Sequence, residues 1–270
     1  MLALVGAGLV FGVWRGVIER LIFQPTAGAD VRPEQLGIDA EDVFLQAEDG
    51  VRLHAYYLPS PGATRGLLFL HGNAGNASHR LPNAAELSRL GVHVLLLDYR
   101  GYGRSEGTPS EVGVYADARA ALAHLVEVRR IPESRIVLFG RSLGGAVAVD
   151  LAQGLPLAGL ILESTFTSVA DVARHLLGVP VGFLLRGRMD SDRKIGNIRS
   201  PILFFHGDRD TVIDHSLGER LYRLAPGPKE FETIQGAGHN DTVSVGGRAY
   251  LSRFAGFLDR VVPEPPLTSP

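Results

Sequence analysis

The sequence of 270 residues contains no cysteine. This absence excludes disulfide bonds, zinc sites built on thiolates and a cysteine nucleophile. There is also no excess of basic charge, because 27 basic residues face 29 acidic ones and the net charge is −2. A polyphosphate backbone needs such an excess, so nucleic acid is not expected as a partner. A hydrophobic content of 45% is, by contrast, typical of an ordinary globular protein.

The N-terminus lacks the length of apolar sequence that a membrane-spanning helix needs. Residues 1–14 are apolar or glycine, but a helix of that length covers about 21 Å of a hydrocarbon core of about 30 Å. Apolar residues then continue at helical spacing opposite Arg15 and Arg20, as in an interfacial helix. We therefore predict that residues 1–25 form an apolar anchor or interfacial helix and that residues 1–23 associate with a membrane. The two arginines favour a cytoplasmic location for the rest of the chain. A helix packed on the domain is the alternative.

After this segment, short strands alternate with helices. Two alternating segments predict a hairpin, and continuous apolar runs indicate strands buried on both faces of a parallel sheet. The hairpin covers residues 43–46 and 51–58, and the buried runs cover residues 66–70, 92–97, 135–139, 160–162 and 202–205. This order predicts an α/β fold with one mostly parallel central sheet and helices on both faces. We expect one domain over residues 26–262 and a disordered, proline-rich tail over residues 263–270.

Three helices have clear sequence signals. Thr108 and Glu111 have the spacing of a capping box, with Pro109 as the first helical residue. A second helix is expected to begin at Ser142, and a last one to cover residues 241–261.

Ser142 lies in the segment Gly140-Arg141-Ser142-Leu143-Gly144, directly after a predicted strand. A serine at a sharp strand-to-helix turn exposes its hydroxyl, and the flanking glycines avoid collisions with neighbouring backbone. The ordinary alternative is a serine that caps a helix. The strand and helix on either side favour a nucleophile.

The residues that could activate this hydroxyl also follow strands. An aspartate lies in His206-Gly207-Asp208-Arg209-Asp210, and His239 follows a short strand at residues 231–234. An imidazole can take the proton of a serine hydroxyl when a carboxylate fixes its tautomer. Asp208, Asp210 and Glu163, which ends another strand, are the candidate carboxylates. The chain order serine, aspartate, histidine is that of a hydrolase triad on an α/β sheet.

A glycine-rich turn, His71-Gly72-Asn73-Ala74-Gly75-Asn76, follows the strand at residues 66–70. Such a turn can present a backbone N–H to a developing oxyanion, together with the N–H of Leu143. We predict Asn73 as the donor, with Gly72 as the alternative. His71 and His206 lack a third ligand at a suitable spacing and are interpreted as hydrogen-bonded turn residues, so no metal is predicted. No nucleotide-binding glycine motif is present, so no cofactor is predicted either.

These motifs resemble those of the α/β-hydrolase superfamily, in particular the serine-aminopeptidase-like branch with the bud-emergence-type and depalmitoylating abhydrolases. The similarity covers nearly the whole chain in the right order, at residues 23–25, 71–76, 98–107, 140–145, 206–210 and 238–241. The resemblance places the acid three residues after the glycine of His206-Gly207, at Asp210, and leaves Asp208 as a neighbour. It also implies a small lid, here about residues 165–195, and an N-terminal membrane anchor in many members.

The predicted function is that of a serine hydrolase. It would cleave a carboxylic ester or thioester through an acyl-Ser142 intermediate, with His239 as base and then acid, Asp210 as its partner, and the Asn73 and Leu143 amides as oxyanion donors. The apolar lid segment suits a small-molecule or acylated substrate, although it could equally pack on the sheet. The alternatives are an acyltransferase or serine peptidase on the same residues, or a membrane-anchored scaffold without activity.

Overall fold

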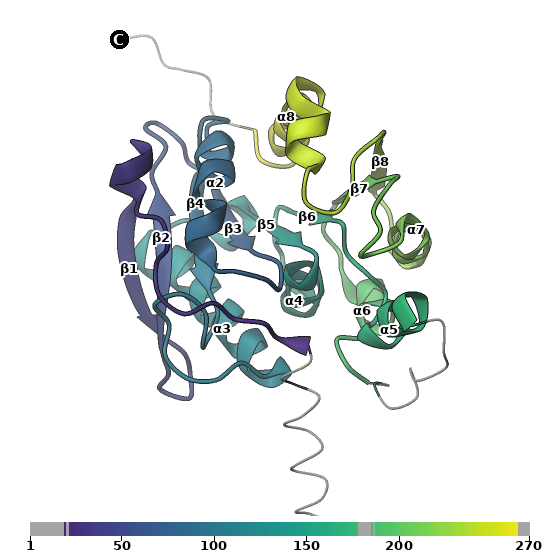
Figure 1. Cartoon of the computed structure of the whole chain (residues 1–270). Coiled ribbons are helices and arrows are strands. Elements are labelled where there is room, and N and C mark those ends of the chain that lie inside the picture. The colour runs from purple at the N-terminus through teal and green to yellow at the C-terminus, as the bar shows by residue number, and fades with distance from the viewer. Residues whose placement is uncertain (1–18, 20–21, 178–184, 186, 264–270) are drawn as a thin grey trace, which may run out of the picture.

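The computed structural model describes residues 19, 22–177, 185 and 187–263. Its centre is a twisted sheet with the strand order β1-β2-β4-β3-β5-β6-β7-β8 (Figure 1). The first two pairings, β1 with β2 and β2 with β4, are antiparallel, and all others are parallel. The strands are β1 (Glu41–Gln46), β2 (Arg52–Leu58), β3 (Gly66–Leu70), β4 (His93–Asp98), β5 (Ile136–Arg141), β6 (Gly159–Glu163), β7 (Ile202–Gly207) and β8 (Lys229–Ile234).

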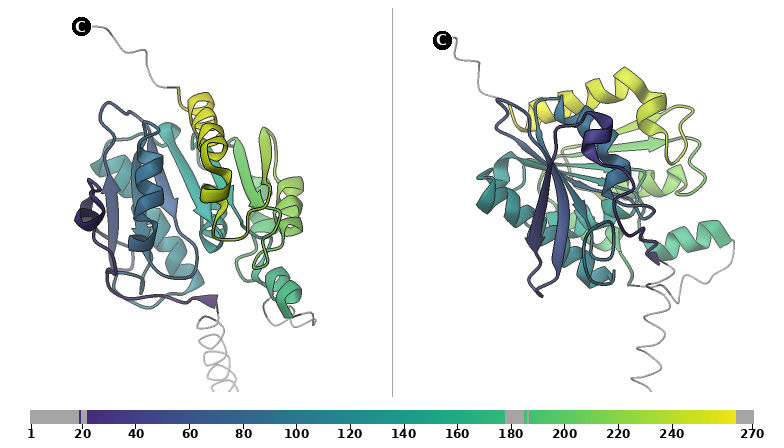
Figure 2. Two further views of the ribbon diagram at one scale, coloured as in Figure 1. Left: turned by 45° about the horizontal axis from the view of Figure 1, so that its top comes forward. Right: turned by 60° about the vertical axis from the view of Figure 1, so that its left-hand side comes forward.

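Helices cover both faces of the sheet, as the two views of Figure 2 show. The α-helices are α2 (Leu81–Ser88), α3 (Glu111–Ala123), α4 (Leu143–Ala152), α5 (Val169–Leu177), α6 (Ser191–Lys194), α7 (His215–Leu224) and α8 (Thr242–Val261). Shorter turns are η1 (Pro33–Leu36), η2 (Ala77–Arg80), η4 (Glu133–Arg135) and η6 (Ile195–Asn197), with a π-helical turn at η3 (His124–Val128).

The two sides of the sheet form two separate apolar cores because side chains alternate along each strand. Leu68 and Leu70 of β3 point into the core that holds α3, α4 and α7, whereas Leu67 and Phe69 point into the core that holds α2 and α8. The five residues of β3 are all buried, as the continuous apolar run predicts. The predicted α/β fold, with a mostly parallel sheet between two helical layers, is confirmed.

The structure corrects one predicted helix boundary. Helix α3 begins at Glu111 with Ser110 as its cap, whose Oγ accepts a hydrogen bond from the N–H of Gly113 at 3.1 Å. The prediction that Thr108 caps the helix and that Pro109 is its first residue is therefore wrong by two positions. Ser110 has the extended backbone that a cap requires, so the nearer hydroxyl takes this role. The helices predicted after Ser142 and over residues 241–261 are found as α4 and α8.

Most of the predicted anchor lies outside the described residues, and membrane association through residues 1–23 stays a prediction. Within the part of the chain that the structure describes, no helix combines the length and apolar character needed to cross a bilayer. The last residues of the predicted anchor pack on the domain: Phe23 is 3% exposed, and Pro25 forms a bridge with Gly75. Of the predicted lid and tail, residues 178–184, 186 and 264–270 also lie outside the description.

Candidate active site

Three predicted side chains meet at the carboxyl edge of the sheet. Ser142 follows β5, Asp210 follows β7 and His239 follows β8. The Nε2 atom of His239 lies 3.0 Å from the Oγ of Ser142, and its Nδ1 atom lies 2.7 Å from Oδ2 of Asp210. The imidazole therefore joins a hydroxyl to a carboxylate in one hydrogen-bonded chain, although 97 residues separate Ser142 from His239.

The turn that presents Ser142 is strained and needs its glycines. Ser142 has φ of 53° and ψ of −118°, a backbone conformation that costs a non-glycine residue about 1–3 kcal/mol. A Cβ atom at Gly144 would lie 2.0 Å from the carbonyl oxygen of Leu70, and one at Gly140 would lie 2.5 Å from the carbonyl oxygen of Gly144. The backbone of β3, β5 and α4 can thus come close enough to hold the hydroxyl at the sheet edge.

Asp210 is a buried carboxylate that remains ionised. Burial raises the pKa of Asp210, but hydrogen bonds from His206 and His239, and from the backbone N–H of Ile213, outweigh burial and hold this pKa far below its ordinary value of 3.8. Its Oδ1 accepts the N–H groups of Val212 and Ile213 at 2.9 and 2.8 Å. Because the folded-state pKa lies below the unfolded value, Asp210 stabilises the fold above pH 3.8, and this contribution disappears as the pH falls further.

The two rival carboxylates have other partners. Oδ1 of Asp208 accepts the backbone N–H of Gly236 at 2.6 Å. Glu163 is fully buried, and its carboxylate is bound by Arg141, Thr242 and Tyr250. Asp210 is thus the carboxylate that contacts the imidazole of His239.

The two residues predicted to supply the oxyanion donors belong to the cavity that contains the hydroxyl of Ser142. Asn73 and Leu143 line the same cavity as Ser142. Leu143 is the first residue of α4, where a backbone N–H has no acceptor within the helix. The side chain of Asn73 is turned to other partners, because its Oδ1 accepts the N–H of Gln24 and the hydroxyl of Tyr102, both at 2.9 Å. Its backbone N–H, rather than its amide group, is therefore the predicted donor.

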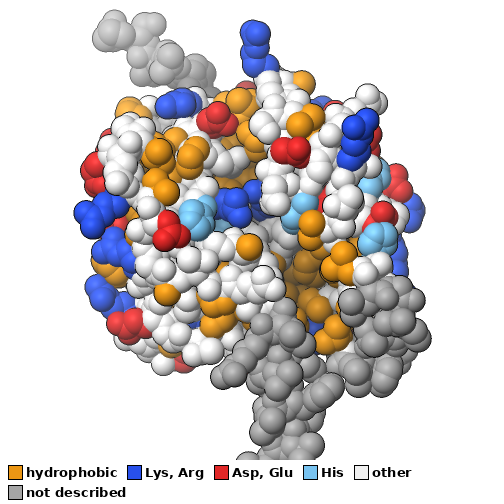
Figure 3. Space-filling model, viewed as in Figure 1, with side chains coloured by type: hydrophobic (Ala, Val, Ile, Leu, Met, Phe, Trp, Pro, Cys, Tyr) orange, Lys and Arg blue, Asp and Glu red, His pale blue; other side chains and the backbone are white. Residues whose placement is uncertain are grey.

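The cavity over Ser142 has a volume of about 600 Å³, and its lining residues are of two kinds, which we call its apolar half and its polar half. One half is apolar and is formed mainly by α5 and its neighbours, and the other carries two arginines beside the histidine loop. Figure 3 shows basic side-chain atoms between two histidines near the centre of one face, above an apolar recess. The apolar half consists of Ile22, Phe166, Val169, Val172, Ala173, Leu176, Leu185, Val212 and Ile213, and the polar half of Asn73, Arg80, Arg141, His239 and Asn240.

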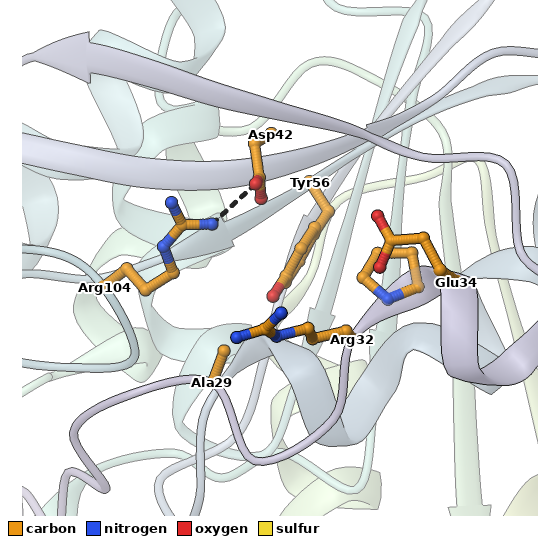
Figure 4. Close-up of a pocket in the computed structure, with 7 residues that line it drawn as sticks. Ala29, Arg32, Glu34, Asp42, Tyr56 and Arg104 are labelled. Carbon is orange, nitrogen blue, oxygen red and sulfur yellow. Dashed lines mark ion pairs between the residues drawn. The ribbon is translucent and has the colours of Figure 1, made fainter.

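A second cavity, of about 540 Å³, lies beside β1 and β2 (Figure 4). Arg32, Arg104 and Tyr56 point into it, and Arg104 is paired with Asp42 at 2.6 Å. It contains neither a nucleophile nor a histidine. This second cavity therefore lacks the groups that meet in the cavity over Ser142.

His71 and His206 are hydrogen-bonded to backbone carbonyls, as predicted, but only His71 lies in a turn, because His206 is part of β7. Nδ1 of His71 lies 2.7 Å from the oxygen of Gly72, and Nε2 of His206 lies 2.9 Å from the oxygen of Ile213. Among the described residues, no cluster of three histidine or acidic side chains could hold a metal ion.

Comparison with known proteins places this geometry in a family. A family model described as serine aminopeptidase, S33, matches residues 62–183. The uncharacterized protein Rv2307c of Mycobacterium tuberculosis is 40% identical over 261 residues, covering 96% of this chain and 92% of that protein. The protein bem46 of Schizosaccharomyces pombe is 35% identical over 241 residues, covering 84% and 79% of the two chains. This chain belongs to the bem46-like branch of the α/β hydrolases.

Solved structures agree with this assignment at the level of the fold. An esterase from Pyrococcus furiosus superposes on this α/β hydrolase with a TM-score of 0.73 at 23% identity, covering 88% of this chain and 98% of the esterase. The predicted resemblance to the serine-aminopeptidase-like and bud-emergence-type hydrolases is confirmed.

Sequence reasoning missed two arginines of the hydrolase site. Arg141 donates to Glu163 through Nε at 2.9 Å and to the carbonyl oxygen of His239 through Nη2 at 2.9 Å, so it braces the loop that carries the imidazole. Arg80 lines the cavity from the end of η2. The sequence does contain one indication that Arg80 lacks a local ion-pair partner: no acidic residue lies within four positions of it on either side.

Proposed function

We propose that this α/β hydrolase cleaves a carboxylic ester or thioester through an acyl-enzyme formed on Ser142. The observation that carries the proposal is the hydrogen-bonded chain from the Oγ of Ser142 to Nε2 of His239 at 3.0 Å and from Nδ1 of His239 to Asp210 at 2.7 Å. A hydroxyl, an imidazole and an ionised carboxylate in this order constitute an activated nucleophile.

The reaction follows from the roles of these groups. Nε2 of His239 takes the proton of Ser142 as Oγ attacks the carbonyl carbon, and the backbone N–H groups of Asn73 and Leu143 bind the resulting oxyanion. When the tetrahedral intermediate collapses, the imidazolium donates this proton to the departing alcohol or thiol. Water then attacks the acyl-enzyme with His239 again as base, which releases the acid and restores the hydroxyl.

The apolar half of the cavity supports an acyl group as the part of the substrate that remains on Ser142. Val169, Val172 and Leu176 of α5 line the cavity together with Phe166, so apolar carbons can be buried against them. Burying each methylene of an acyl chain there contributes about 0.8 kcal/mol. Chain length should therefore affect kcat/KM strongly.

An aminopeptidase is the second candidate, favoured by the description of the matching family model. A free α-amino group is cationic at neutral pH, and its recognition calls for a carboxylate near the scissile bond. The described lining of the cavity contains two arginines and no acidic side chain. This charge favours ester or thioester hydrolysis over the removal of a cationic N-terminal residue. An acyltransferase would form the same acyl-enzyme and differ in the acceptor.

The test combines labelling and turnover. A fluorophosphonate probe should label the wild-type protein and the Ser244→Ala control, whose serine is exposed on α8, but not Ser142→Ala. A series of 4-nitrophenyl esters of increasing acyl length, run beside aminoacyl 4-nitroanilides, should show ester cleavage that rises with chain length. Labelling of Ser142→Ala, or cleavage of the anilides alone, would contradict the proposal.

A further inference from the structure

The cavity over Ser142 carries positive charge that the proposed reaction does not use. Arg80 and Arg141 line it, and no aspartate or glutamate is among its described lining residues. Arg141 is neutralised by Glu163, at 2.9 Å from its Nε, and its Nη2 binds the loop of His239. Arg80 is the lining arginine for which the structure records no ion pair.

Arg80 has unused hydrogen-bonding capacity. Its Nε is buried without a hydrogen-bond partner, and its Nη2 makes one long contact, of 3.3 Å, with the carbonyl oxygen of Ala74. Burial lowers the pKa of Arg80, and the positive charge of Arg141 lowers it further, against a smaller opposing effect of Glu163. An arginine still keeps its charge at neutral pH, so this guanidinium is left partly desolvated in the cavity that also contains Ser142. An anion from the substrate would satisfy both its charge and its donors.

The position of Arg80 indicates which part of the substrate carries that anion. The apolar half of the cavity suits the acyl chain, so the leaving group must extend toward the polar half. His239, which protonates the leaving group, lies on that side, because Arg141 binds the carbonyl oxygen of His239 and, at 3.4 Å, Oδ1 of Asn240. Arg80 and Arg141 line this same half. Charge on the leaving group would therefore lie within reach of Arg80.

We propose that Arg80 binds a negative charge on the leaving group, so that the preferred substrates are acyl esters or thioesters of an anionic alcohol or thiol. This inference rests on the proposed hydrolase activity and adds a substrate class to it. A guanidinium can donate paired hydrogen bonds to the oxygens of either a carboxylate or a phosphate. Leaving groups that carry either anion therefore belong to the proposed substrate class. A neutral leaving group would leave Arg80 desolvated and unpaired.

The first test compares three substrates with the same octanoyl group: 4-octanoyloxybenzoate, 4-octanoyloxyphenyl phosphate and the neutral 4-octanoyloxybenzamide. Hydrogen bonds to charged groups predict that Arg80→Gln lowers the ratio of kcat/KM for either anionic ester over the neutral ester by about 10- to 100-fold. Taking the ratio between enzymes cancels the intrinsic reactivity of each ester. The larger of the two changes identifies carboxylate or phosphate as the better ligand.

Two controls isolate the position of the charge. Arg89→Gln removes the same charge from an exposed site at the end of α2 and should leave the ratio unchanged. Arg80→Lys should retain part of the preference, because it keeps the charge and loses the planar fork. A further test needs no substitution: in the wild-type protein, 0.5 M salt should lower the ratio of kcat/KM for the anionic esters over the neutral ester. An unchanged ratio in Arg80→Gln would overturn the proposal.

A binding measurement separates this inference from the proposed function. Calorimetry with octyl phosphate and with octanol requires no turnover. Octyl phosphate should bind the wild-type protein more tightly than octanol does. Arg80→Gln should lower the affinity for octyl phosphate by about 10- to 100-fold. Equal binding of octyl phosphate to both proteins would contradict the role of Arg80 even if the esters are cleaved. Loss of binding in Arg80→Gln without any Ser142-dependent cleavage would uphold the anion site and reject the hydrolase.

Discussion

His239 and His54 both contact aspartates, but the two rings have different surroundings. His239 places Asp210 on one ring nitrogen and the hydroxyl of Ser142 on the other. His54, in β2, places a carboxylate on each side: Asp98 lies 2.8 Å from Nδ1 and Asp42 lies 2.9 Å from Nε2. A histidine beside an aspartate is thus insufficient for catalysis. The group on the second nitrogen determines what the ring can do.

Access separates the two histidines as well. His239 lines the cavity over Ser142, whereas His54 is fully buried, packed edge-on against Tyr56. The polar cavity of Figure 4 reaches Asp42 and Tyr56 but not His54. We therefore expect His239 to act on substrates and His54 to hold β1, β2 and β4 together.

The largest expected effect is on catalysis at His239. His239→Ala should reduce kcat by several orders of magnitude, since comparable substitutions in serine proteases reach about 10⁶. Adding Ser142→Ala should cause little further loss, because the two groups act as a unit. Steady-state hydrolysis of a 4-nitrophenyl ester measures both. Additive losses would show that the serine and the histidine work independently.

His54→Leu should affect stability instead. Removing the ring leaves Asp98, which is 2% exposed, without its hydrogen bond to Nδ1 of His54, and leaving a buried polar group short of a partner costs about 1–3 kcal/mol of the free energy of unfolding. Urea denaturation measures this loss. His54→Gln, which keeps an N–H donor, should lose less. Full stability in His54→Leu would show that the network around Asp98 does not hold the strands.

A third histidine, His71, gives an effect that depends on pH. Burial lowers the pKa of His71 to about 4 from its ordinary 6.5, and its Nε2 has no hydrogen-bond partner. In the unfolded chain, His71 is therefore protonated below about pH 6.5, whereas in the folded protein it is protonated only below about pH 4. Stability should fall by up to about 3 kcal/mol as the pH decreases across this window.

The control for this prediction is His71→Asn, which cannot titrate there. Urea denaturation at a series of pH values should show a shallower decline for this variant than for the wild-type protein. Parallel curves would mean that His71 binds a proton equally well in the folded and unfolded states.

The residues that the sequence predicted best are those that follow continuous apolar runs. Ser142, Asp210 and His239 each come after a strand, and the carboxyl ends of parallel strands share one edge, so local pattern and topology suffice to bring them together. The motif resemblance then selected Asp210 over Asp208 and Glu163.

The features that the sequence could not predict depend on long-range pairing. The antiparallel pairing of β2 with β4 brings His54 opposite Asp98, 44 residues away, and no local pattern reports that register. The role of Arg80 depends on the absence of an acidic side chain among the described residues that line the cavity with it, and these residues come from several segments of the chain. The cap of α3 depends on which of two nearby hydroxyls meets the N–H of Gly113.

The contacts of Arg141 have a consequence for how this enzyme can acquire new substrates. This side chain directly precedes Ser142, pairs with Glu163 and donates to the carbonyl oxygen of His239, so it fixes the separation between Ser142 and His239, the pair for which we propose proton transfer. Helix α5 supplies much of the apolar wall and takes no part in that brace. Mutations in α5 can therefore change the shape of the apolar lining without altering the distance between Ser142 and His239.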